Sequence, residues 1–147
     1  MSRDWTIDTW VLYEVAKVNL CASSFINTVL RKQHYIVLDH EKEIQGEYER
    51  CFNLVNNQAS RALRKWFRSI LKRNRSNCLD RRCKRRLRAL VFDQDDWPFI
   101  GVCVKSANKN LVAEESDYTP EVREYLNDDL KINVLSIEEA LDSFQEM

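Results

Sequence analysis

Five acidic residues are the ones in this sequence whose type and position could do chemistry: Asp8, Glu47, Asp96, Glu115 and Asp117. The first and the last two directly follow short apolar runs that are typical of buried strands, and the other two lie on the inward sides of helical patterns. A carboxylate removed from water without compensation costs several kcal/mol, so a packed core does not accept this many. We therefore expect the acids to share one opening.

Carboxylates that converge on one cleft repel one another, which raises their pKa values unless a cation relieves the repulsion. All-oxygen ligation favours a hard ion, so the expected cofactor is Mg²⁺ or Mn²⁺ and not zinc. Such an ion holds phosphate oxygens and activates water for in-line attack. The plainer alternative is that Asp8 and Asp96 only cap helices and that Glu47 is a partly exposed helical acid.

The elements that must position these acids alternate between strand and helix along the chain. Apolar runs predict strands at 5–8, 35–39, 110–114 and 132–137, and apolar stripes predict helices at 22–30, 44–55, 62–71, 98–107 and 136–144. Pro98 suits the first turn of its helix, and Ser136 with Glu139 predicts a capping box. This alternation predicts an α/β fold, a three-layer α/β/α sandwich on a mostly parallel sheet, whose ligands bind at the carboxyl ends of the strands.

Length and composition indicate one domain over residues 1–147, because 44% of the residues are apolar and only two glycines and two prolines interrupt the patterns. No run of about 18 apolar residues and no export signal is present, so we expect a cytoplasmic protein with five reduced cysteines. Cys78 and Cys83 are spaced too loosely, and lack the second cysteine pair, for a strong zinc prediction.

Charge is unevenly distributed although the net charge is zero. Residues 61–88 hold 13 lysines or arginines and the single acid Asp80, with Trp66 and Phe67 among them. Such a segment attracts nucleic-acid phosphate or an acidic partner, and its alternative is a pair of solvated helix faces. The side chains expected to guide RNA are Arg61, Arg64, Lys65, Arg68 and Lys72.

Four stretches resemble the PIN domain family of small metal-dependent ribonucleases, which includes the toxins of toxin-antitoxin pairs. They are IDTWVL, IQGEYERCF, DDWPFIGVC and NLVAEESDY, in the order and approximate spacing of the family. The resemblance implies that Asp8, Glu47, Asp96, Glu115 and Asp117 are the catalytic, metal-binding acids of an Mg²⁺- or Mn²⁺-dependent endoribonuclease. It also implies a homodimer and a possible antitoxin partner.

The sequence departs from the family at three positions. Ala113 stands where a hydroxyl residue is usual, Glu115 is one methylene longer than the usual Asp, and Trp10 replaces a small polar residue. These changes favour an alternative, a catalytically weakened RNA-binding or protein-interaction module. A phosphoacceptor receiver or a topoisomerase-primase-like fold fits less well, because the first expects an acid pair after the first strand and the second expects a Glu there.

Overall fold

The computed structural model describes residues 2–114 and 116–146. Within these ranges the chain forms five strands and eight α-helices, and two short 3-10 turns. In chain order they are β1 (Asp4–Ile7), α1 (Thr9–Ala16), α2 (Leu20–Arg31), β2 (Tyr35–Asp39), α3 (Glu43–Leu54), α4 (Asn57–Ser69), β3 (Leu71–Arg75), α5 (Arg81–Ala89), η1 (Gln94–Asp96), α6 (Trp97–Val104), β4 (Asn110–Val112), α7 (Pro120–Leu130), β5 (Asn133–Leu135), α8 (Ile137–Ser143) and η2 (Phe144–Glu146).

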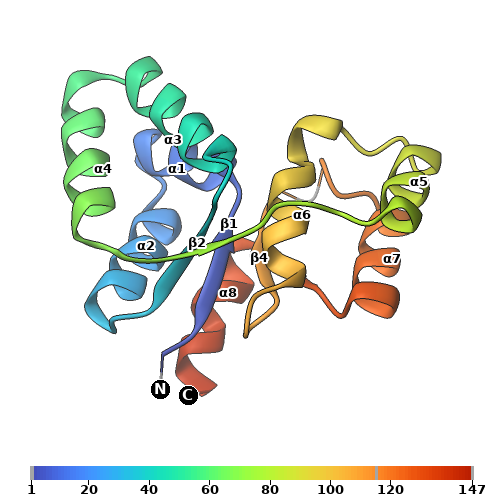
Figure 1. Ribbon diagram of the computed structural model, residues 1–147. Helices are drawn as coiled ribbons and strands as arrows, with labels where there is room; N and C mark the ends of the chain where they lie inside the picture. The colour runs from blue at the N-terminus through green and yellow to red at the C-terminus, as the bar shows by residue number, and fades with distance from the viewer. Residues whose placement is uncertain (1, 115, 147) are drawn as a thin grey trace.

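The strands form one parallel sheet in the order β3-β2-β1-β4-β5, which confirms the predicted α/β sandwich. Helices α1 to α4 lie on one side of the sheet and α5 to α7 lie on the other (Figure 1). Helix α8 packs against α2 and β5. The chain therefore adds β2 and β3 on one side of β1, then crosses back to add β4 and β5 on the other side.

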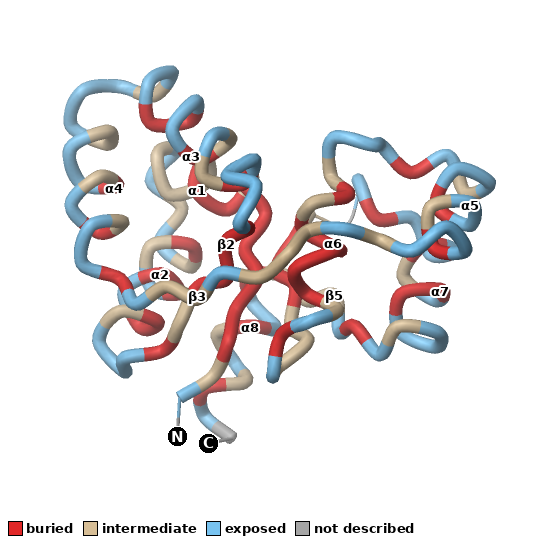
Figure 2. Tube along the Cα trace, viewed as in Figure 1, coloured by how far each residue is buried: buried red, intermediate tan, exposed pale blue. Residues whose placement is uncertain are grey.

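The core follows from the position of β1 in the middle of the sheet. All four residues of β1 are buried, and Figure 2 shows the buried residues concentrated along the sheet and the inner faces of the helices. The ring of Trp5 lies 5.2 Å from that of Phe25 and 5.3 Å from that of Phe144, which ties the end of the chain to its first strand. Buried apolar side chains of both layers form one cluster around these residues.

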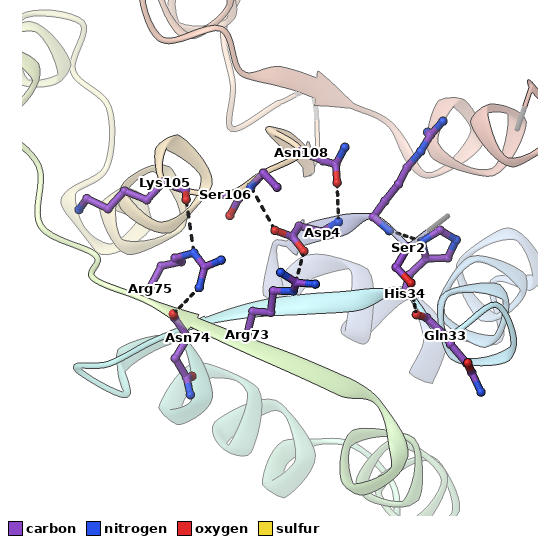
Figure 3. Close-up of polar contacts among 12 residues, drawn as sticks. Ser2, Asp4, Gln33, His34, Arg73, Asn74, Arg75, Lys105, Ser106 and Asn108 are labelled. Carbon is purple, nitrogen blue, oxygen red and sulfur yellow. Dashed lines mark hydrogen bonds and ion pairs between the residues drawn. The ribbon is translucent and has the colours of Figure 1, made fainter.

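Strand β3 was not predicted, because its sequence LKRNR is polar and the apolar stripe of the preceding helix was extended to Leu71. Tertiary pairing determines its structure, since residues 71–75 pair in parallel with β2. Arg73 Nε lies 3.2 Å from Asp4 Oδ1, an ion pair that lacks the direction of a hydrogen bond (Figure 3). The Arg73 guanidinium also lies over the ring of Tyr35. Basic side chains are common on edge strands, where they prevent pairing with other chains.

Helices α1, α5 and α7 were likewise not delimited from the sequence. Strand β1 ends at Ile7, so Trp10 lies in the first turn of α1 and not in a strand. Helix α5 shows no apolar stripe in the sequence, because only Cys83 and Leu87 of its nine residues are buried and most of the others are charged. The predicted capping box of Ser136 and Glu139 is present at the start of α8, and proline occupies the first turn of α6. Among the described residues, no helix has the length and apolarity needed to cross a membrane.

Helix α6 approaches the chain segment after β3 so closely that only glycine fits at position 101. A Cβ atom on Gly101 would lie 2.0 Å from the backbone oxygen of Asn77 and 2.5 Å from its carbonyl carbon. We expect Gly101→Ala to lower the free energy of unfolding by about 1–3 kcal/mol, the usual cost of overpacking. Denaturant unfolding followed by circular dichroism measures this change.

Gly46 provides the matched control because it lies inside α3 with no atom within 4 Å of its Cβ position. Gly46→Ala is expected to stabilise the protein by about 0.5–1 kcal/mol, since alanine restricts the unfolded chain and favours helix. Equal effects of the two substitutions would contradict the close approach at Gly101.

Candidate functional site

The candidate site lies where the chain connections diverge in the middle of the sheet. From the adjacent strands β1 and β4 the chain continues into opposite layers, to α1 and to α7 (Figure 1). In parallel α/β sheets this divergence opens a crevice at the carboxyl ends of the strands, and ligands bind there. Asp8 follows β1 directly, and its backbone N–H donates to the carbonyl of Val112 at 2.9 Å. Glu114 and Asp117 follow β4, and their charges act on Asp8.

Asp8 is a buried carboxylate with a weak structural role. It stands at the N-cap of α1, where its Oδ1 accepts a hydrogen bond of 3.4 Å from the backbone N–H of Trp10. That distance is long for a hydrogen bond, so capping uses little of the capacity of the carboxylate. Burial raises the pKa of Asp8 from 3.8 to about 6, and the charges of Asp117 and Glu114 add to the rise.

Asp96 occupies the N-cap position of α6, as predicted, yet its side chain makes no capping hydrogen bond. The neighbouring Asp93 performs that role for the preceding turn, accepting from the backbone N–H of Asp95 at 3.0 Å. Burial raises the pKa of Asp96 from 3.8 to about 7, with further increases from the charges of Asp8, Asp93 and Asp117. A carboxylate held near other acids without a structural partner is a typical functional group.

Tyr118 presents a polar atom without a partner to the same group of acids. The residue is 1% exposed, and its Oη has no hydrogen-bond partner among the described residues. Burial raises the pKa of Tyr118 well above 10, and the charges of Asp8, Asp96 and Asp117 contribute. Leaving a buried hydroxyl unpaired costs about 1–3 kcal/mol, so this atom marks a place where a bound polar group would be stabilised.

Glu47 is not one of the acids whose charges raise the pKa values of Asp8 and Asp96. Its Oε1 accepts a hydrogen bond of 2.6 Å from Arg50, one turn further along α3. Glu47 lines a cavity of about 650 Å³ together with Asp95 and Trp97, the residues on either side of Asp96. Glu115, the fifth predicted acid, lies outside the described residues.

Asp39, which also ends a strand, has a structural role. Its Oδ1 accepts from the backbone N–H of Ile44 at 2.9 Å, and its Oδ2 accepts from that of Glu43 at 3.0 Å. Asn77 Nδ2 donates to the same Oδ2 at 2.6 Å and to Glu43 Oε2 at 2.7 Å. Sequence reasoning missed Asn77, because a lone asparagine after a polar strand carries no signal that it fixes the start of a distant helix.

The donor atoms fit a hard divalent cation in type and in charge. All of them are oxygens, the pKa values of Asp8 and Asp96 are raised by burial and mutual repulsion, and the buried Tyr118 hydroxyl lacks a partner. Among the described residues, no group of three or more Asp, Glu, His or Cys side chains is arranged to hold a metal ion. Mg²⁺ sites commonly use only one or two carboxylates and keep several waters, so the acids remain compatible with such an ion.

The basic segment is divided between two surfaces. Helices α4 and α5 lie at opposite ends of the molecule (Figure 1), and the edge strand β3 comes between them in the chain. Of the five predicted RNA-binding residues, Arg61, Lys65 and Arg68 are exposed on α4. Lys72 Nζ instead donates to the carbonyls of Phe67 and Ile70 at the end of α4, and Arg64 Nη2 donates to Asn53 Oδ1 at 2.6 Å. Two of the five cations are therefore already engaged within the protein.

The cysteines do not form a cluster. All five are free; Cys83 is buried beside Tyr125, whereas Cys78 is exposed.

Comparisons with known protein families, with curated proteins and with solved structures found no match. The resemblance to the PIN family therefore rests on the four sequence motifs, and the chemistry of the site is argued from its geometry.

Proposed function

We propose that this protein is a divalent-metal-dependent ribonuclease that cleaves phosphodiester bonds of RNA, that Asp8 and Asp96 are its central metal-binding acids, and that Asp117 adds negative charge near them. The observation that carries the proposal is the proximity of two carboxylates, the buried Asp8 that follows β1 and the half-buried Asp96 at the start of α6. Neither is neutralised by a protein cation in an ion pair within the described residues. The motif resemblance adds Glu47 and Glu115 to this set.

The protein itself positions the carboxylates and supplies a hydrogen-bond donor. Asp8 is anchored by its backbone hydrogen bond to β4, and Asp96 by the first turn of α6, so the two carboxylates are presented by rigid elements. The hydroxyl of Tyr118 is available to donate to a phosphate oxygen or to a water molecule. A bound Mg²⁺ or Mn²⁺ would supply charge stabilisation at the phosphate and a lowered pKa of water.

A second candidate function is an RNA-binding module that lacks cleavage activity. It is favoured by the lack of a three-ligand metal group among the described residues and by Ala113 and the longer Glu115. This alternative keeps the basic surfaces and predicts RNA binding at low salt without dependence on metal. The homodimer and the antitoxin partner stay predictions from the resemblance.

Calorimetric titration with Mn²⁺ and a cleavage assay test the proposal together. We expect Mn²⁺ to bind with a stoichiometry of one or two ions, and unstructured RNA to be cut faster than a stable hairpin. Chelator should abolish cleavage. If the protein binds RNA but shows neither heat of Mn²⁺ binding nor cleavage, it is the RNA-binding module and not a ribonuclease.

A further inference from the structure

The cavity beside Asp96 contains features that the acid cluster does not account for. Its walls come from α3, from α5 with the start of α6, and from residues 77–79 after β3. Two cations from different helices, Arg50 and Lys84, line it together with the apolar side chains of Leu79, Trp97 and Pro98. At about 650 Å³ it falls within the range of ligand pockets, roughly 300–1,000 Å³.

We infer that single-stranded RNA enters the site through this cavity, where Arg50 and Lys84 contact its phosphates and Leu79, Trp97 and Pro98 face a base. The inference rests on the proposed function, and it assigns to this cavity the role that the sequence suggested for α4. Asp95 and Trp97 flank Asp96, so a strand in the cavity passes directly beside the proposed metal-binding acids.

Neither cation is held by a strong ion pair. Arg50 pairs with Glu47, but the side chains are 66% and 37% exposed, and such surface pairs contribute only about 0–1 kcal/mol. A phosphate can therefore replace that carboxylate at little cost. Lys84 lies partly buried in the wall and forms no ion pair among the described residues. Glu43, Glu47 and Asp95 also line the cavity, so Arg50 and Lys84 are the two places in its wall that attract a phosphate.

The walls favour a single strand over a duplex. Single-stranded RNA can turn its bases toward protein side chains, whereas an A-form helix keeps them stacked inside. The guanidinium of Arg88 lies 5.2 Å from the centroid of the Trp97 ring and helps to fix the indole. Trp97 is only 7% exposed, so most of the apolar wall beside the two cations comes from the half-buried Leu79 and Pro98.

Helix α4 is poorly placed for the same role. It lies on the far side of α3 from α6, at the opposite end of the molecule from α5 (Figure 1). Its arginine Arg64 and the following Lys72 are engaged by Asn53 and by backbone carbonyls. The exposed Arg61 and Arg68 therefore offer the rival surface that the experiment must compare with Arg50 and Lys84.

Fluorescence anisotropy with a labelled unstructured ten-nucleotide RNA, in chelator to prevent cleavage, tests the inference. We expect the double variant Arg50→Ala/Lys84→Ala to bind about tenfold more weakly at low salt. Its slope of log affinity against log salt should be smaller by about 1.4, because each phosphate contact on a single strand contributes about 0.7. Lys84→Ala alone, which leaves the Glu47–Arg50 pair intact, should lose about half of that slope difference.

Two charge-matched variants locate the effect. Arg31→Ala/Lys32→Ala removes two exposed cations at the end of α2 and should leave affinity within about twofold of the wild type. Arg61→Ala/Arg68→Ala tests the rival surface, and a loss there as large as in the cavity variant would overturn the inference. Unchanged binding by the cavity variant, with Mn²⁺-dependent cleavage intact, would overturn this inference alone. A wild-type protein that neither binds nor cuts RNA would overturn the proposed function as well.

Discussion

Asp96→Asn is expected to lower the rate of RNA cleavage by about 10²–10³-fold, the usual effect of removing one preorganised charge-stabilising group. The substitution removes a negative charge without removing a cap, because the Asp96 side chain makes no capping hydrogen bond. Asparagine is also a favourable N-cap residue, so α6 should start at the same place. Single-turnover cleavage of an unstructured RNA with saturating Mn²⁺ measures the change in the chemical step.

Asp142 supplies the control because it is exposed on α8, which lies in the other layer. Asp142→Asn should cleave within about twofold of the wild type. Circular dichroism and the midpoint of urea unfolding establish that each variant is folded. If the double variant Asp8→Asn/Asp96→Asn cleaves RNA at the wild-type rate, these acids are not the metal-binding group and the assignment is wrong.

Asp8→Asn is expected to stabilise the metal-free protein at about pH 8, by up to about 3 kcal/mol. The folded-state pKa of Asp8 is raised from 3.8 to about 6, and a difference of that size corresponds to about 3 kcal/mol between the two protonation states. Below pH 3.8 the carboxyl is protonated in both the folded and the unfolded chain, so its burial does not lower the free energy of unfolding. The cost appears as the pH rises from about 4 to about 6, where the unfolded chain ionises first.

Asparagine resembles the protonated acid and preserves the cap on Trp10, so the variant avoids this loss. Urea unfolding in chelator at about pH 4, 6 and 8 should show a stability difference that is small at the lowest pH and largest at the highest. Saturating Mn²⁺ should remove the difference at pH 8, because it stabilises only the wild type. A variant less stable than the wild type at pH 8 would mean that the Asp8 carboxylate has a structural role.

Much of the fold could be predicted because its strands are buried. Strands β1, β2 and β4 are runs of apolar residues, and their alternation with helical stripes leaves a parallel sheet as the natural arrangement. Strand β3 and helix α5 could not be predicted in the same way. Their residues are mostly charged, and pairing with β2 or packing of two buried side chains fixes them instead.

The candidate site could be predicted in part for a related reason. Acids that follow parallel strands lie at the same edge of the sheet, and the pairing of β1 with β4 then brings Asp8 near Asp117. The remaining features depend on contacts and arrangements that no local sequence pattern predicts. Glu47 pairs with Arg50, and Asn77 joins the end of β2 to the start of α3. The basic segment is divided because α4, before β3, and α5, after it, lie on opposite sides of the sheet.

The central place of β1 has a consequence for how the protein is made. Strands β1, β2 and β3 and their helices can assemble on the ribosome from the first 75 residues, yet β4 pairs with β1 only after residue 112 has emerged. Asp8 is then still without Asp96 and Asp117. A nascent chain of this protein is therefore unable to bring Asp8, Asp96 and Asp117 together until residue 117 has left the ribosome.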